Sequence, residues 1–166
     1  MKVLFLCLGN ICRSPLAEGA FRQLLAERAI SDFEADSAGT GGWHAGEPPD
    51  PRSVRTARAH GVDISAQRAR QLHADDFARF DWIVAMDGDN LRTAAARRPP
   101  GARFERARLI ALVDVFPVPP AHDHVPDPYY GDLAGFHEVW SLLQAGMPHL
   151  LAHIRASSDS PTEARS

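Results

Sequence analysis

The sequence predicts an α/β fold, a single domain built as a doubly wound sandwich with helices on both faces of a four-stranded parallel sheet. Four short apolar runs of strand length alternate with segments of helical spacing, the pattern of βαβ units with right-handed crossovers. The 166 residues, 45% of them hydrophobic, suit one domain with a complete core. We therefore predict one folded domain over residues 1–156 and a disordered tail over residues 157–166, whose composition is typical of disorder.

The first strand and the first helix are joined by the stretch "CLGNICRSP" at residues 7–15. The preceding run "KVLFL" is continuous and apolar, as in a strand buried on both faces of a parallel sheet. Ser14 is the expected N-cap and Pro15 suits the first helical turn. The helix is expected to continue to about Arg28, because apolar residues recur at helical spacing: Leu16, Ala17, Ala20, Phe21, Leu24 and Leu25.

The middle of the chain supplies the other three predicted strands and three helices. Strands are expected at "FEADSAG", "DWIVAM" and "ARLIALV", and a surface loop at the glycine- and proline-rich "GTGGWHAGEPPDP". A helix is expected over "PRSVRTARAHG", closed by Gly61, and a shorter one over "ADDFARF". Asp87 is the expected cap of a helix over "DGDNLRTAAARR".

The C-terminal third combines a long loop with one helix. Residues 114–132 are rich in proline and predict no regular element, which in a compact domain indicates a functional loop. An amphipathic helix is expected from about Leu133 to Ile154. Trp82 and Trp140 lie on apolar faces of their elements and are expected in the core.

Charge and composition exclude several classes of partner. The formal net charge is −3 and the arginines are spread along the chain, so we expect no binding to nucleic acid or to an anionic membrane. No apolar run approaches the roughly 20 residues that span a bilayer, and the N-terminus lacks the features of a signal peptide. Two cysteines exclude a disulfide scaffold and fit a reducing compartment, so a cytoplasmic location is predicted.

The loop at residues 7–15 has the features of an anion site. Backbone N–H groups that point inward form an anion nest, and the helix dipole adds partial positive charge at the same place. Gly9 permits close approach, and the planar fork of Arg13 can hold two oxygens of a phosphoryl group. We therefore predict that the loop binds phosphate or another oxyanion.

Cys7 stands where it would form the floor of this nest. The donors that attract phosphate also favour a thiolate over a thiol, and a thiolate beneath a bound phosphate is a nucleophile aimed at phosphorus. Alternative interpretations are an inert buried cysteine, a metal site or a redox pair with Cys12. A nucleotide-binding P-loop fits poorly, because Arg13 stands where that motif needs lysine.

Five motifs, in order along the chain, resemble the low-molecular-weight protein tyrosine phosphatases: "CLGNICRSP", "DSAGT", "GWHAGEPPD", "ARQL" and "DPYYG". The resemblance spans roughly residues 2–155 and implies a phosphatase domain that requires no metal and no cofactor. It implies that Cys7 forms a phosphocysteine intermediate, that Arg13 clamps the phosphoryl group and that Asp127 is the general acid. An alternative for Asp127 is a simple turn, since Asp and Pro are common turn residues.

The resemblance also implies binding and supporting roles. Ser14 would hydrogen-bond the nucleophile, and Asn10 and Ser37 would brace the loop, with Asn10 suited to a left-handed backbone conformation. The predicted substrate-binding residues are those of the loop and an aromatic rim: Leu8, Gly9, Asn10, Ile11, Cys12, Ser14, Trp43, Tyr129 and Tyr130.

Some positions depart from the family or have a second interpretation. Relatives with threonine at the position of Ile11 resemble protein-arginine phosphatases, so Ile11 favours tyrosine. Gln67 replaces a histidine of many bacterial members and could still hydrogen-bond toward the loop. Cys12 could form a reversible disulfide with Cys7, or it could be only a small packed side chain. The pair His122 and His124 is interpreted as solvated loop residues.

The sequence thus predicts a protein-tyrosine phosphatase that acts on phosphotyrosine-containing proteins, and we expect an autophosphorylating bacterial tyrosine kinase among them. Two other functions stay open. An arsenate reductase of the same fold passes oxidation to downstream cysteines, and the sequence has none after Cys12. A non-catalytic phosphate-binding module would lack the nucleophile, the arginine or the acid, and all three are present.

Overall fold

The computed structural model describes residues 1–159 and contains one parallel sheet of four strands. These are β1 (Lys2–Cys7), β2 (Glu34–Gly39), β3 (Trp82–Ala85) and β4 (Arg108–Ala111). Their order across the sheet is β2-β1-β3-β4, and every neighbouring pair is parallel. The predicted fold class is confirmed.

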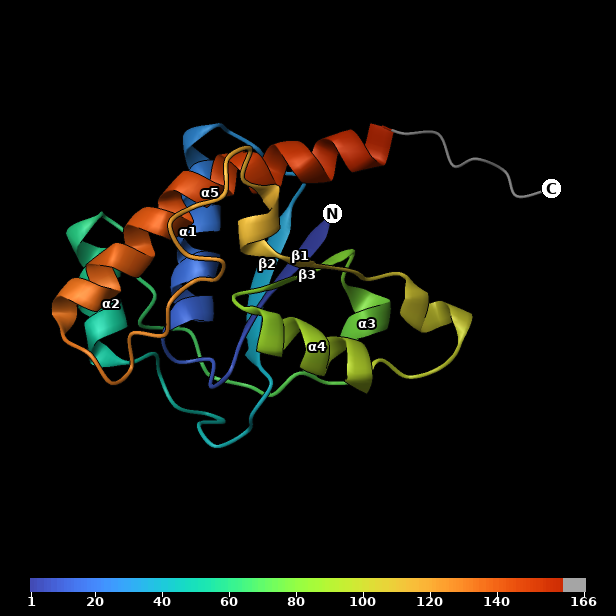
Figure 1. Ribbon diagram of the computed structural model, residues 1–166, viewed down its shortest axis with the longest axis horizontal. Coiled ribbons are helices and arrows are strands. Elements are labelled where there is room, and N and C mark those ends of the chain that lie inside the picture. Colours follow the sequence, from blue (N-terminus) through green and yellow to red (C-terminus); the bar gives the residue numbers. More distant parts are fainter. Residues whose placement is uncertain (160–166) are drawn as a thin grey trace.

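Helices cover both faces of the sheet (Figure 1). One face packs against α1 (Arg13–Glu27) and α5 (Leu133–Asp159), with α2 (Pro51–Ala59) beside them. The other carries α3 (Asp76–Arg79) and α4 (Gly88–Arg97). Alternate residues of β1 point to the two faces, as the pleat of a strand requires, so the strand is buried on both sides.

Several predicted boundaries and caps are confirmed. Gly61 closes α2 with a φ of 78°, a left-handed conformation that glycine adopts at little cost. The carboxylate of Asp87 caps α4 by accepting a hydrogen bond from the backbone N–H of Asn90. Trp82 and Trp140 are buried in the core, as expected.

The expected N-cap of α1 is wrong. The helix begins at Arg13 with Cys12 as the capping residue, and no side chain caps it. Ser14 lies inside the helix, and its hydroxyl contacts Cys7 and Asn10 instead of capping the helix.

The C-terminal part also differs from the prediction. The fourth strand stops at Ala111, and Leu112–Val115 forms a 3₁₀ turn instead of continuing the strand. The helix α5 extends to Asp159, so residues 157–159 are helical and not part of a disordered tail. The carbonyl of Ser157 accepts a hydrogen bond from the guanidinium of Arg108, which ties this last turn to the sheet. The rest of the expected tail, residues 160–166, lies outside the described residues.

The topology places the loop after β1 at the carboxyl edge of the sheet, where ligands bind in open α/β folds. From β1 the chain first moves to β2 on one side and later crosses to β3 on the other. The loop between β1 and α1 therefore lies at the switch point of the sheet. No helix within residues 1–159 is long and apolar enough to cross a membrane.

Candidate active site

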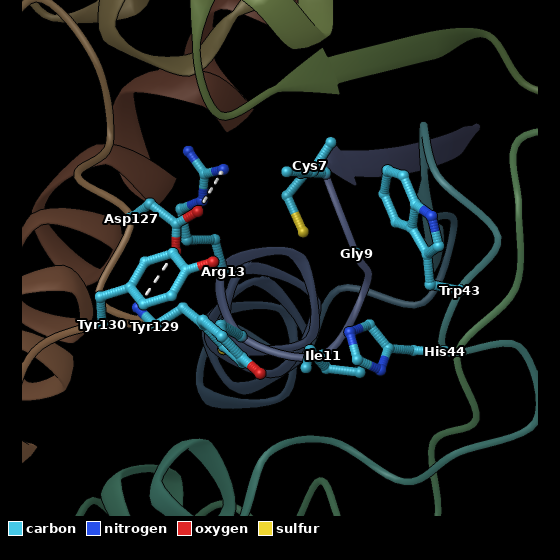
Figure 2. Close-up of a pocket in the computed structure, with 11 residues that line it drawn as sticks. Cys7, Gly9, Ile11, Arg13, Trp43, His44, Asp127, Tyr129 and Tyr130 are labelled. Carbon is cyan, nitrogen blue, oxygen red and sulfur yellow. Dashed lines mark hydrogen bonds and ion pairs between the residues drawn. The ribbon is translucent and has the colours of Figure 1, made fainter.

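The loop between β1 and α1 surrounds the sulfur of Cys7. Figure 2 shows this sulfur between Arg13 and Asp127 on one side and Trp43 on the other. The backbone N–H of Asn10 donates to Cys7 Sγ at 3.3 Å, and Ser14 Oγ lies 3.0 Å from the same atom. Two hydrogen-bond donors can therefore stabilise a thiolate at this position, in addition to the N-terminal end of α1.

The side chain of Asn10 links the loop to β2 and to the backbone at Arg70. Its φ is 57°, the left-handed conformation expected for it. Its Nδ2 donates to Ser14 Oγ at 2.8 Å and to Ser37 Oγ at 3.0 Å, and its Oδ1 accepts from the backbone N–H of Arg70 at 3.0 Å. Because Ser14 Oγ accepts from Nδ2, its own proton can be donated either to Cys7 Sγ at 3.0 Å or to the carbonyl of Ala38 at 3.4 Å, and the sulfur is the nearer of the two. The structure thus brings the three predicted bracing residues together.

A buried carboxylate extends this network, and the sequence analysis missed it. Ser37 Oγ donates to Glu18 Oε2 at 2.9 Å, and Arg22 Nε donates to Glu18 Oε1 at 2.9 Å. Burial raises the pKa of Glu18, although both hydrogen bonds act in the opposite direction. The available signal was its position four residues after Ser14, which puts Glu18 on the buried face of the helix.

Arg13 is buried between two carboxylates. It donates from Nη1 to Asp87 Oδ2 at 2.7 Å and to the carbonyl of Val125 at 3.1 Å, and from Nη2 to Asp127 Oδ2 at 3.4 Å. Burial alone would lower the pKa of Arg13, but its interactions with Cys7, Asp87 and Asp127 outweigh burial and raise that pKa. The guanidinium therefore remains positively charged beside the sulfur. The role of Asp87 beyond its helix cap was not predicted.

A pocket of about 280 Å³ opens above the sulfur. Its rim is aromatic and open to solvent, since Trp43 is 72% exposed and Tyr130 is 96% exposed. Asn10, Ser14 and Ser37 support the loop but do not line the pocket. The lining residues are Cys7, Leu8, Gly9, Ile11, Cys12, Arg13, Trp43, His44, Asp127, Tyr129 and Tyr130.

His44 lines the pocket and was not predicted, although it lies in the motif "GWHAGEPPD". Its Nδ1 lies 2.8 Å from Glu47 Oε2. A Cβ at Gly9 would lie 3.2 Å from His44 Cδ2, so a larger side chain there would crowd the imidazole. The imidazole therefore packs against the outer side of the loop between β1 and α1.

Cys12 is a free buried thiol that differs chemically from Cys7 in its surroundings. Burial, followed by the negative charges of Asp50, Cys7 and Asp127, raises the pKa of Cys12 to about 12. It therefore remains protonated near neutral pH and is a poor nucleophile. Both cysteines are free in the structure, and the disulfide between them stays a prediction.

Two lesser expectations have plain outcomes. Gln67 reaches α1 instead of the loop, because its Nε2 donates to the carbonyl of Pro15 at 3.3 Å. His122 and His124 are exposed or nearly so and pair with carboxylates, His122 with Glu138 and His124 with Asp123.

The geometry therefore combines a cysteine in an anion cradle, a charged arginine beside it and a carboxylate at the pocket wall. A family model described as low molecular weight phosphotyrosine protein phosphatase matches residues 2–160. The chain belongs to this family. The resemblance predicted from the five motifs is confirmed, and the protein is a hydrolase of the low molecular weight protein-tyrosine-phosphatase class.

Individual relatives agree with this assignment over nearly the whole chain. The low molecular weight protein-tyrosine-phosphatase of Streptomyces coelicolor is 41% identical over 156 residues, which cover 93% of each chain. The crystal structure of a protein tyrosine phosphatase from Entamoeba histolytica is 33% identical, with a TM-score of 0.87 over 95% of this chain and 99% of that one. A structure described as Drosophila arginine phosphatase is 31% identical, with a TM-score of 0.83 over 93% and 98%.

Proposed function

We propose that this protein hydrolyses phosphotyrosine in proteins, and aryl phosphates in vitro, through a phosphocysteine intermediate on Cys7. The observation that carries the proposal is the convergence on one pocket of the Cys7 sulfur, the Arg13 guanidinium and the Asp127 carboxylate. Asp127 comes from a segment more than a hundred residues away in sequence, so its presence there is independent of the loop motif.

In the first step the phosphoryl group occupies the loop, and the Cys7 thiolate attacks phosphorus. The bond from phosphorus to the aryl oxygen breaks, and Asp127 gives its proton to that oxygen, so that the phenol leaves neutral. Arg13 turns part of its hydrogen bonding from the two carboxylates to the phosphoryl oxygens, where its planar fork neutralises the charge.

In the second step a water molecule replaces the phenol. The carboxylate of Asp127 takes a proton from this water as its oxygen attacks phosphorus, and the sulfur leaves as a thiolate. The hydroxyl of Ser14, 3.0 Å from the sulfur, stabilises the departing charge by donating a hydrogen bond. Inorganic phosphate is released and the starting state is restored. The chemistry of each step is supplied by side chains of this chain.

The rim supports a preference for aromatic phosphoesters. A phenyl ring can pass between Trp43 and Tyr129 while its phosphate reaches the loop, whereas the shorter phosphoserine leaves the phosphate above the nucleophile. Phosphoarginine is the second candidate substrate, because one structural relative is described as an arginine phosphatase. Ile11 lines the pocket wall. The resemblance described above implies that it favours phosphotyrosine, because relatives with threonine at this position resemble arginine phosphatases.

The decisive experiment is to trap the intermediate. Turnover of phosphotyrosine is quenched by denaturation at alkaline pH, where a phosphocysteine is more stable than in acid, and the protein is digested and analysed by mass spectrometry for phosphate on Cys7. We expect phosphate on Cys7, no turnover by Cys7→Ser and a higher kcat/KM for phosphotyrosine than for phosphoarginine. Full activity of Cys7→Ser would refute the covalent route, and a preference for phosphoarginine would change the substrate.

The remaining expectations are tested in parallel. Cys7→Ser keeps the pocket and serves as a trap for protein substrates, among which we propose an autophosphorylating tyrosine kinase. Thioredoxin-dependent turnover of arsenate would favour the arsenate reductase, and binding of phosphate without turnover would favour the non-catalytic module. We propose a cytoplasmic location, which fractionation of the cells would check.

A further inference from the structure

Arg52, in the first turn of α2, bonds to the turn that follows Asp127. Its Nη2 donates to the carbonyl of Tyr129 at 3.0 Å, and its Nη1 donates to the carbonyl of Gly131 at 3.0 Å. The two partners lie 77 and 79 residues away in sequence. One guanidinium thus holds both sides of Tyr130 through the backbone.

The same guanidinium is anchored on the phosphate-binding loop through Asp50. Its Nε and Nη2 donate to the two carboxylate oxygens of Asp50 at 3.0 and 2.9 Å, and the backbone N–H of Asp50 donates to the carbonyl of Ile11 at 2.8 Å. Burial alone would raise the pKa of Asp50, but its hydrogen bonds to Arg52 outweigh burial and lower it. Asp50 therefore stays ionised, and an unbroken series of bonds joins the phosphate-binding loop to the Asp127 segment.

Two aromatic rings lie beside the Arg52 guanidinium. Its Cζ lies 4.5 Å from the ring centroid of Phe136 and 5.8 Å from that of Tyr129. A planar fork can reach a carboxylate and two carbonyls from this position, whereas the single ammonium of lysine cannot. The arrangement therefore uses properties that are specific to arginine.

The turn bonded to Arg52 also contacts the Asp127 side chain. The backbone N–H of Tyr129 donates to Asp127 Oδ1 at 3.2 Å, and the N–H of Gly131 donates to the carbonyl of Pro128 at 3.0 Å. The Asp127 side chain is 43% exposed, and its other bond is the 3.4 Å contact to Arg13. In the proposed mechanism Arg13 turns to the phosphoryl group, which would leave the hydrogen bond from the Tyr129 N–H as the contact that orients the Asp127 carboxyl group.

We infer that Arg52 is a positioning residue for proton transfer, which holds residues 127–131 so that Asp127 reaches the oxygen of the leaving group. The inference rests on the proposed function, since it requires Asp127 to be the proton donor. The inference gives α2 a role in the reaction, although this helix is distant in sequence from both the loop at residues 7–15 and residues 127–131.

The test compares Arg52→Met with Arg55→Met, which removes an exposed guanidinium from the same helix. We measure kcat/KM, which reports the steps through phosphorylation of Cys7, for aryl phosphates whose phenols differ in acidity. Arg52→Met is expected to lose about 10- to 100-fold with phenyl phosphate and phosphotyrosine, because a small displacement of the acid is costly. The loss should be much smaller with dinitrophenyl phosphate, whose leaving group needs no proton. Inhibition by inorganic phosphate should not change.

Two reference variants separate this inference from the proposed function. Asp127→Ala shows whether the acid role is correct, and the double variant Arg52→Met/Asp127→Ala should be no slower than Asp127→Ala alone. If the loss in kcat/KM of Asp127→Ala were the same for all leaving groups, the acid role of Asp127 would be wrong, and the inference with it. Two results would overturn the inference alone while Asp127→Ala shows the expected dependence on the leaving group. In one, Arg52→Met loses equal activity with all leaving groups; in the other, the losses of Arg52→Met and Asp127→Ala multiply in the double variant.

Arg52→Lys provides a second test if Arg52→Met does not fold, because lysine keeps the positive charge beside Asp50. It lacks the fork, so we expect a smaller loss with the same dependence on the leaving group. Wild-type values of kcat/KM for Arg52→Lys across the series would show that the fork does not position the acid.

Discussion

Two regions meet at the pocket and differ in how they are held in place: the loop at residues 7–15, here the phosphate-binding loop, and residues 116–132, here the Asp127 segment. In the loop, Cys7, Asn10 and Ser14 are buried and bond to one another within eight residues of chain. Residues 116–132 contain no helix or strand, and much of the segment is exposed. Long-range bonds attach it, among them Arg13 to the carbonyl of Val125 and Arg52 to that of Tyr129.

The difference follows from what each region does in the proposed reaction. Nucleophile and charge stabilisation act best when their dipoles are oriented before the substrate arrives, which requires a rigid loop. The proton donor must let a phenol leave and a water molecule enter, which requires an open wall. We therefore expect changes in the loop to slow all substrates alike, and changes in the Asp127 segment to depend on the leaving group.

The largest effect is expected for Arg13→Lys. Lysine offers a point charge in place of the fork, so kcat/KM should fall by about 10³-fold with every aryl phosphate, whatever its leaving group. Steady-state kinetics across a series of phenols measures it. Arg92→Lys, at an exposed arginine that pairs with Asp89, is the matched control and should retain full activity. A loss confined to poor leaving groups would erase the proposed distinction between the two regions.

Asp127→Ala should come second. The loss in kcat/KM for phosphotyrosine is expected to be about 10²-fold, because general acid catalysis is removed while the cradle remains. With a strongly acidic phenol the loss should nearly vanish. The measurement is the slope of log kcat/KM against leaving-group pKa, which should become steeper. An unchanged slope would argue that the proton comes from another group.

Asn10→Ala tests how the loop keeps its shape. It removes one hydrogen bond each from Ser14 Oγ and Ser37 Oγ and the acceptor of the Arg70 N–H, and we expect the free energy of unfolding to fall by about 2–3 kcal/mol. Asn10→Gly loses the same bonds but tolerates a φ of 57°, so it should be about 1 kcal/mol more stable than the alanine variant. Urea denaturation measures both. Equal free energies of unfolding for Asn10→Ala and Asn10→Gly would mean that the left-handed conformation at residue 10 costs alanine no stability.

Cys12→Ser has the smallest expected effect, and it appears only at high pH. Folding raises the pKa of Cys12 from 9.0 to about 12, so above pH 9 the unfolded chain binds fewer protons than the folded chain. The free energy of unfolding therefore falls as pH rises, by roughly 1 kcal/mol per pH unit from this group. Urea denaturation between pH 8 and 11 should show a steeper decline for the wild type than for Cys12→Ser. Parallel curves would contradict the burial of a neutral thiol.

Local sequence patterns predicted the order of strands and helices along the chain and the loop at residues 7–15. The run "KVLFL" predicted a strand buried on both faces, and β1 is one. Boundaries were less predictable where long-range contacts act. The last turn of α5, where Arg108 bonds to Ser157, continues through residues whose composition suggested disorder.

What the sequence by itself determined is the short-range chemistry, because Cys7, Asn10, Arg13 and Ser14 need only a strand, a turn and a helix start to converge. What only the tertiary structure decided is the set of partners that arrive from elsewhere. Asp87 on Arg13, Glu18 beneath Ser37, His44 against Gly9 and Arg52 on the turn after Asp127 depend on which segments meet. Hydrogen bonds and burial act over a few ångströms, so such pairs leave no spacing in the sequence from which they could be predicted.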